Sequence, residues 1–255
     1  MSSAAALAFD AIADRFDERF GEWASVAAQR RAVYAMLQRA FPVGSRVLEI
    51  GGGTGIDAAW LTARGRNVFL TDASPAMVRV AKERLGRRTA VLPAEQVGEL
   101  SVGLFDGAFS NFAALNCVLD LPAVAKGLAK QVRPGGQVML VLFGGFAPGE
   151  CIVQLARRDW RSAIRRFRHE APARLGGRHF TVRYHRPWEI TSAMRPWFRL
   201  VRRRGIGIFV PPSAAEPWIS RHPRLLGALE AIDRVVSAPL AALGDHVLYQ
   251  FERIV

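Results

Sequence analysis

The 255-residue chain is poor in cysteine, with only Cys117 and Cys151, and it has no long apolar run. Two cysteines cannot form a disulfide framework, and the cysteines and histidines do not show the spacing of metal ligands. No stretch approaches the roughly 18–20 apolar residues that a membrane-spanning helix needs. The first residues lack the basic start of a secretory signal. We therefore expect a protein without a metal site in a reducing cytoplasm.

Lysine is scarce as well, since Lys82, Lys126 and Lys130 are the only three in a chain with a net charge of +13. Arginine supplies the excess, and it is concentrated in residues 151–204, which hold fifteen arginines and three acidic residues. The rest of the chain is close to neutral. Half of all residues are apolar, so a chain of this length can bury the core of one domain.

The most informative segment is Val-Leu-Glu-Ile-Gly-Gly-Gly-Thr-Gly at residues 47–55, an apolar strand that enters a glycine-rich turn. A helical pattern begins at once with Ile56. A strand, turn and helix of this kind bring backbone N–H groups and a helix N-terminus against a nucleotide-like ligand. Downstream, a second apolar run ends at Asp72, where a ribose would offer its hydroxyls.

The glycine spacing distinguishes between two kinds of nucleotide-like ligand. The dinucleotide pattern G-x-G-x-x-G fails because Ile56 stands at its last glycine. Instead, Glu49 is followed by glycines at alternating positions, Gly51, Gly53 and Gly55. An acid disfavours a pyrophosphate and favours a ligand that carries an ammonium and a sulfonium. The pattern resembles the first motif of class I S-adenosylmethionine-dependent methyltransferases.

Further segments resemble the motifs of this family in the same order. They are Asp72-Ala73-Ser74-Pro75, Pro93-Ala94-Glu95, residues 105–112 and residues 132–136, and the stretch from Phe9 to Asp17 resembles the helical cover of small-molecule methyltransferases. The resemblance implies that S-adenosylmethionine is the cofactor and that Asp72 bridges its ribose hydroxyls. It implies the following cofactor-binding residues: Glu49, Gly51, Gly52, Gly53, Gly55, Asp72, Ala73, Ala94, Glu95 and Asn111.

Two of these residues have structural alternatives. Asp72 stands where a carboxylate often caps the N-terminus of a helix. Asn111 stands at the end of an apolar strand, where an Asx turn would stop the strand. Either side chain therefore contacts the cofactor or acceptor, or serves the local backbone.

The alternation of patterns predicts an α/β, Rossmann-like, doubly wound and mostly parallel seven-stranded sheet. We expect strands at 46–50, 67–71, 89–92, 105–110, 137–143, 198–201 and 246–251, of which the resemblance implies that the last is antiparallel. As domains, we predict one methyltransferase domain made of an N-terminal helical cover at 1–43, a cofactor-binding core at 44–143, a basic cap insertion at 144–197 and C-terminal strands and helix at 198–255.

The cap is predicted to contain one helix over residues 150–168 and a strand over 179–185. In that helix Val153, Ala156, Trp160, Ile164 and Phe167 form an apolar stripe, with arginines on the other face. The arginines suit a lid over an anionic or acyl-carrier-bound substrate, or peripheral contact with an anionic membrane or partner. RNA binding is less favoured because few aromatic residues interleave the arginines. A merely solvated face is the remaining alternative.

The predicted activity is methyl transfer to a small-molecule acceptor, anionic or lipophilic, at an oxygen atom. We assign no catalytic base; Tyr184 and His185 of the predicted cap strand are candidates unless they face solvent, and Trp23 and Phe112 are further acceptor-contact candidates. The segment at residues 110–113 lacks the Asn/Asp-Pro-Pro-aromatic signature of amino-methylating relatives, so we expect no DNA substrate. The alternative is a non-catalytic protein of this fold that binds an anionic membrane, protein or RNA through residues 151–204. The sequence leaves the acceptor and the oligomeric state open.

Overall fold

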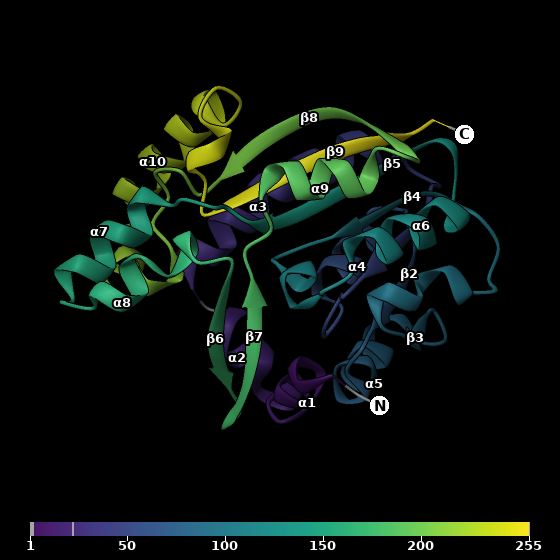
Figure 1. The fold of residues 1–255 in the computed structure, drawn as a ribbon, viewed down its shortest axis with the longest axis horizontal. Coiled ribbons are helices and arrows are strands. Elements are labelled where there is room, and N and C mark those ends of the chain that lie inside the picture. The colour runs from purple at the N-terminus through teal and green to yellow at the C-terminus, as the bar shows by residue number, and fades with distance from the viewer. Residues whose placement is uncertain (1–2, 22, 255) are drawn as a thin grey trace.

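The central feature is one seven-stranded sheet with the strand order β3-β2-β1-β4-β5-β9-β8 (Figure 1). The computed structural model describes residues 3–21 and 23–254, with the backbone alone for 19–21. The strands are β1 (Arg46–Ile50), β2 (Asn67–Asp72), β3 (Thr89–Val91), β4 (Phe105–Ser110), β5 (Val132–Phe143), β8 (Phe198–Ile206) and β9 (His246–Arg253). Strands β1 to β5 pair in parallel, whereas β9 is antiparallel to β5 and β8. The predicted fold class is confirmed.

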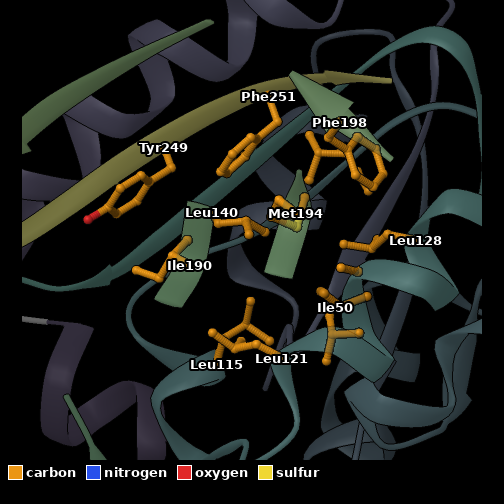
Figure 2. Packing of buried hydrophobic residues seen from close by; sticks show 14 of the residues in the cluster. Ile50, Leu115, Leu121, Leu128, Leu140, Ile190, Met194, Phe198, Tyr249 and Phe251 are labelled. Atoms are coloured by element: carbon orange, nitrogen blue, oxygen red, sulfur yellow. The ribbon is translucent and has the colours of Figure 1, made fainter. Parts of the chain in front are cut away.

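Helices cover both faces of this sheet. They are α3 (Ala24–Ala40), α4 (Ile56–Thr62), α5 (Pro75–Leu85), α6 (Leu121–Gln131), α9 (Pro187–Met194) and α10 (Pro223–Val236). Successive strand residues point to opposite faces, so Leu48 and Ile50 belong to one core and Val47 to the other. In Figure 2, side chains of α6 and α9 pack on Leu140 and Phe251 of the sheet. The burial of both faces explains why the central strands β1, β4 and β5 are mostly apolar, whereas the edge strand β8 is largely exposed and carries arginines.

The N-terminal cover consists of α1 (Ala4–Asp10), the 3-10 turn η1 (Ala13–Arg15) and α2 (Phe16–Gly21), before the longer α3. The remaining 3-10 turns are η2 (Ala94–Glu99), η3 (Ala114–Cys117), η4 (Arg165–Phe167), η5 (Ser213–Ala215), η6 (Ile219–Arg221) and η7 (Ala241–Leu243). Within residues 3–21 and 23–254, no helix combines the length and the hydrophobicity needed to cross a bilayer.

The prediction of one cap helix over residues 150–168 is wrong. The chain forms α7 (Pro148–Ala156), turns at Arg158 with a left-handed φ of 59°, and continues as α8 (Trp160–Ala163). In a straight helix Glu150 and Arg165 would lie about 22 Å apart, at 1.5 Å per residue. The turn brings these two side chains into an ion pair instead. A tertiary contact therefore overrides the helical periodicity.

Beyond α8 the cap forms a two-stranded ribbon of β6 (Glu170–Leu175) and β7 (Arg178–Arg183). The predicted strand at 179–185 corresponds to β7, whereas β6 was not predicted. The ribbon extends from the sheet to the N-terminal cover, where the rings of Phe180 and Phe9 lie 5.9 Å apart (Figure 1). The cap and the cover therefore meet beside the carboxyl ends of the parallel strands.

Candidate cofactor and acceptor site

The glycine-rich turn follows β1 at the carboxyl edge of the sheet. Gly51, Gly53 and Gly55 have φ values of 65°, 54° and 80°, a left-handed conformation that side chains disfavour. At Gly51 a Cβ atom would also lie 2.5 Å from Cβ of Ala114 in η3. The alternating glycines therefore allow a tight turn that packs under η3 and leads directly into α4.

Asp72, the last residue of β2, lies against this turn. Its Oδ2 accepts a hydrogen bond of 2.8 Å from the Gly53 N–H, and its Oδ1 accepts one of 2.8 Å from the Ser74 N–H. Ser74, not Asp72, caps α5, because its hydroxyl oxygen accepts the Met77 N–H. The helix-cap alternative for Asp72 is therefore wrong. Burial raises the pKa of Asp72, and the two backbone N–H groups partly oppose that shift.

Glu49 is buried beneath the turn, where the Arg30 guanidinium and the Ala58 N–H only partly compensate its charge. Its Oε2 has no hydrogen bond among the described residues, and neither has the Ser110 hydroxyl at the end of β4. Burial raises the pKa of Glu49 well above its usual value, and the nearby carboxylates of Asp57 and Asp72 raise it further. An orphaned acceptor of this kind favours a bound cation or hydrogen-bond donor.

The prediction for Gly52 tests how tightly the turn is packed. A Cβ atom at Gly52 would lie 2.5 Å from Cδ1 of Leu70 and 2.8 Å from the Glu49 carboxyl carbon. We therefore expect Gly52→Ala to lower the free energy of unfolding by about 1–3 kcal/mol, the usual cost of overpacking. The control is Gly145→Ala, where a Cβ meets nothing within 4 Å. Urea unfolding measures both, and equal stabilities would contradict the packing argument.

The N-terminal cover is hydrogen-bonded both to the glycine-rich turn and to the start of α5. Asp10 at the end of α1 accepts the Ala76 N–H at 3.0 Å, at the start of α5. Asp17 in α2 accepts the Thr54 hydroxyl at 2.6 Å, and the Arg84 guanidinium donates to it at 2.6 Å. The cover is thus held across the turn by hydrogen bonds, as its resemblance to methyltransferase covers implies.

The segment Pro93-Ala94-Glu95, which follows β3, lies next to Asp72. The Leu92 N–H donates to the Asp72 carbonyl at 2.9 Å, which places η2 with Ala94 and Glu95 beside the end of β2. Ala94 packs against the core, whereas Glu95 is half-buried. Ala73 directly follows Asp72. The structure therefore brings the predicted cofactor residues to one edge, and their contacts with a cofactor stay predictions.

Asn111 takes part in a buried network that the sequence analysis missed. Its Nδ2 donates to Asp57 Oδ2 at 2.8 Å, and its Oδ1 accepts the Phe112 N–H. Asp57 in turn accepts the Tyr34 hydroxyl at 2.7 Å and lies 3.1 Å from the Arg30 Nε. Asn111 is therefore oriented by α4 as well as by its own backbone. The position of Asp57 in the first turn after the glycines was the available signal.

A row of rings leads from the end of β4 to the cap. The ring centroids of Phe112 and His246 lie 5.5 Å apart, those of His246 and Phe143 4.9 Å apart, and those of Phe143 and Tyr184 5.8 Å apart. The ends of β4 and β5, the start of β9 and the segment that follows β7 therefore meet at this row of rings. Because Phe112 directly follows Asn111, this row begins at the Asn111 network, and its role toward an acceptor stays a prediction.

Arg166 connects the cap to this end of the sheet. Its buried guanidinium pairs with Glu150 and with Asp245 Oδ1, and it donates to the carbonyl oxygens of Gly144 and Asp245 at 3.1 and 2.6 Å. Burial alone would lower the pKa of Arg166, but the carboxylates of Asp245 and Glu150 raise it. The predicted solvated arginine face therefore does not include this residue, which is a buried structural ion.

Asp245 joins Arg166 to the histidine of the ring row. Its Oδ2 lies 3.2 Å from His246 Nδ1 and accepts the Gln29 side-chain N–H at 3.2 Å. Burial would raise the pKa of Asp245, but His246 and Arg166 outweigh it and lower the pKa below its usual value. Sequence reasoning did not identify Asp245 or His246. The start of an antiparallel last strand at the ligand edge was the signal that would have found them.

The other predicted acceptor residues have different surroundings. Tyr184 and His185 are both buried, so the solvent-facing alternative is wrong. His185 Nε2 lies 3.2 Å from the Leu115 carbonyl oxygen, and burial lowers the pKa of the imidazole. Trp23 precedes α3 next to Ser220, whose hydroxyl accepts the Ala24 N–H. In the described ranges no group of three His, Cys, Asp or Glu side chains gathers in a metal-binding arrangement.

Comparison with known proteins agrees with this geometry. A family model for a methyltransferase domain matches residues 48–140. The chain is 30% identical over 200 residues to the biotin biosynthesis bifunctional protein BioCD of Bordetella avium, covering 74% of this chain and 37% of that protein. It is 30% identical over 141 residues to a malonyl-[acyl-carrier protein] O-methyltransferase of Serratia marcescens, covering 54% of each.

Residues 48–140 form a methyltransferase domain, and the chain has the fold of S-adenosylmethionine-dependent methyltransferases. It spans about a third and a half of the lengths of these two relatives. A solved structure of 1,6-didemethyltoxoflavin-N1-methyltransferase from Burkholderia thailandensis, with its substrate and S-adenosylhomocysteine, superposes with a TM-score of 0.57 at 19% identity. That alignment covers 99% of this chain and 89% of the other, and it shows a shared methyltransferase fold.

Proposed function

We propose that this chain transfers a methyl group from S-adenosylmethionine to an oxygen atom of a small acceptor. The observation that carries the proposal is the meeting of the glycine turn, the Asp72 carboxylate and the orphaned Glu49 carboxyl at one edge of the sheet. S-adenosylmethionine offers ribose hydroxyls to Asp72 and an ammonium group that compensates the buried Glu49. The left-handed glycines leave backbone rather than side chains against the ligand.

Bound S-adenosylmethionine would supply a methyl group activated by a positive sulfur. The protein would orient the acceptor and exclude water. The ring row of Phe112, His246, Phe143 and Tyr184 supplies an aromatic wall, and β6 and β7 close against the N-terminal cover. These contacts support the lid interpretation of the cap.

His246 is the side chain that we assign to take the proton of an acceptor hydroxyl. Its Nδ1 lies 3.2 Å from Asp245 Oδ2, and its ring contacts the ring of Phe112, next to Asn111. His185 is less suited, because its Nε2 already faces the Leu115 carbonyl oxygen. The acceptor oxygen would gain the methyl group, its proton would pass to His246, and the sulfur would leave as a neutral thioether.

Oxygen as the methylated atom is supported by the relative from Serratia marcescens, which is a malonyl-[acyl-carrier protein] O-methyltransferase. The basic segment at residues 151–204, with fifteen arginines, suits an acceptor that carries negative charge, including one bound to an acidic carrier. We therefore propose an anionic or carrier-bound acceptor.

The test has two stages. Isothermal titration of the chain should detect binding of S-adenosylmethionine and S-adenosylhomocysteine, and the absence of heat for both at millimolar ligand would refute the proposal. Incubation of cell extract with isotopically labelled methyl donor should then label a small molecule. His246→Asn should bind the donor normally but label the acceptor at least about a hundredfold more slowly, the lower range for loss of a general base. Binding without any labelling would favour the non-catalytic alternative.

A further inference from the structure

The cap exposes large apolar side chains on a short helical hairpin. We call residues 148–168, which comprise α7, α8 and η4, the basic hairpin. Trp160 is 68% exposed and Ile152 is 67% exposed, and Ile164 and Phe167 are also exposed. Helices of a globular domain normally turn such side chains to the core. In Figure 1, α7 and α8 lie at the margin of the molecule, away from the sheet.

The charge around these apolar side chains is mainly positive. Four arginines of the basic hairpin are exposed, namely Arg157, Arg158, Arg161 and Arg168. Of its two acids, Glu150 is buried and paired with Arg166, and Asp159, which caps α8 through the Ser162 N–H, is exposed and offsets one of the four arginines. The outer surface therefore combines a tryptophan and aliphatic side chains with a rim of guanidinium groups.

This combination fits a lipid surface better than a hydrated polyanion. Tryptophan and isoleucine gain free energy by entering the boundary between headgroups and acyl chains, and arginines contact lipid phosphates. RNA would engage the arginines and the aromatic rings, but exposed Ile152 and Ile164 would gain nothing from it. We propose that the basic hairpin docks on the surface of an anionic phospholipid bilayer.

The hairpin is also held firmly enough to orient the whole chain on a membrane. Arg166 fixes η4 to Glu150 in α7 and to Asp245 beside β9. The Phe146 and Phe167 rings stack at 5.7 Å, which joins the two ends of the hairpin. Docking would therefore turn the acceptor side of the site, rather than the cofactor turn, toward the bilayer. The docking proposal itself does not depend on methyl transfer.

Co-sedimentation of the full chain with vesicles tests this proposal. Binding is expected to mixed phosphatidylcholine–phosphatidylglycerol vesicles and not to pure phosphatidylcholine, and it should weaken at high salt. Trp160→Ala should reduce partitioning about tenfold or more, as expected from the lost burial of a large side chain. The matched control is Trp188→Ala on α9, because Trp188 is 67% exposed but lies outside the basic hairpin.

Reversing the charge of two hairpin arginines provides the second test of vesicle binding. The double variant Arg157→Glu with Arg161→Glu should lose at least about tenfold in vesicle binding, since each basic side chain contributes about a fivefold factor. The control reverses two exposed arginines elsewhere in the basic segment, Arg178 and Arg195, and should lose less. Titration with S-adenosylmethionine on every variant separates a failure of docking from a failure of the proposed enzymatic function.

Three outcomes would overturn the proposal. One is absence of binding to the anionic vesicles at low salt. Another is an equal loss of vesicle binding in the hairpin variants and their controls, which would indicate that binding depends on the total charge and not on the basic hairpin. The third is binding of a mixed-sequence single-stranded RNA that the Arg157 and Arg161 reversals abolish, while Trp160→Ala leaves vesicle binding unchanged. That pattern would identify an RNA contact instead.

Discussion

Replacing Arg166 with methionine should lower the free energy of unfolding by about 3–5 kcal/mol, the cost of leaving buried charges without their partner. Arg166 contacts Glu150 and Asp245 at the same time, and all three side chains are buried. Methionine keeps much of the volume but cannot compensate either carboxylate. The loss should therefore exceed that of most single substitutions.

Equilibrium urea unfolding at neutral pH measures this loss. Arg168→Met is the control, because Arg168 is exposed two residues along the same segment, and it should change stability by no more than about 0.5 kcal/mol. Adding Glu150→Gln and Asp245→Asn to Arg166→Met should recover part of the loss, since the variant then contains no uncompensated charge there. A loss below about 1 kcal/mol would show that the ion network does not hold the cap.

The loss of unfolding free energy in Arg166→Met should become smaller at low pH. The pKa of Asp245 in the folded protein lies below its usual value, against the tendency of burial, because of His246 and Arg166. This carboxylate therefore stabilises the wild-type fold fully above its unfolded pKa, and that contribution is lost as pH falls toward the folded pKa. The variant lacks the arginine, so the difference between the two proteins should be full at about pH 5–7 and should shrink as the pH falls below about 4, the usual pKa of an aspartate. A difference that persists unchanged well below about pH 4 would contradict this assignment.

The cofactor end was predictable because its signals are local. The left-handed turn requires glycines at 51, 53 and 55, and a carboxylate at the end of the next strand necessarily reaches the same edge of a parallel sheet. The hydrogen bond between Asp72 and Gly53 follows from these two facts. The strands of the core were likewise recognisable, because burial on both faces makes them mostly apolar.

The acceptor end was less predictable because its residues meet only through the fold. Asp57 looks like an ordinary acid in the first turn of a helix, yet it contacts Tyr34 and Arg30 of α3 and Asn111 after β4. Asp245 and His246 carry no motif of their own. The spacing of apolar residues over 150–168 fits a straight helix, but the pairing of Arg166 with Glu150 bends the chain back. A contact between distant residues determines each of these features.

Replacing Asp72 with alanine should weaken S-adenosylmethionine binding by about 1.5–3 kcal/mol, or roughly ten- to 150-fold in Kd. The substitution removes the acceptor proposed for the ribose hydroxyls and also frees the Gly53 N–H that orders the turn. Asp72→Asn separates these effects, because its amide keeps an acceptor oxygen without the charge and should lose less affinity.

The matched control for Asp72→Ala is Asp106→Ala, at the opposite edge of the same sheet. Asp106 also accepts a backbone N–H, that of Arg46 at 2.7 Å, and it pairs with Arg133 at 3.0 Å. Its loss should reduce stability but leave cofactor affinity unchanged, since the amino ends of parallel strands lie away from the ligand edge. Calorimetric titration of the three variants with S-adenosylmethionine measures these affinities. Wild-type affinity in Asp72→Ala would remove Asp72 from the site, whereas equal losses in the Asp72 and Asp106 variants would reflect general unfolding.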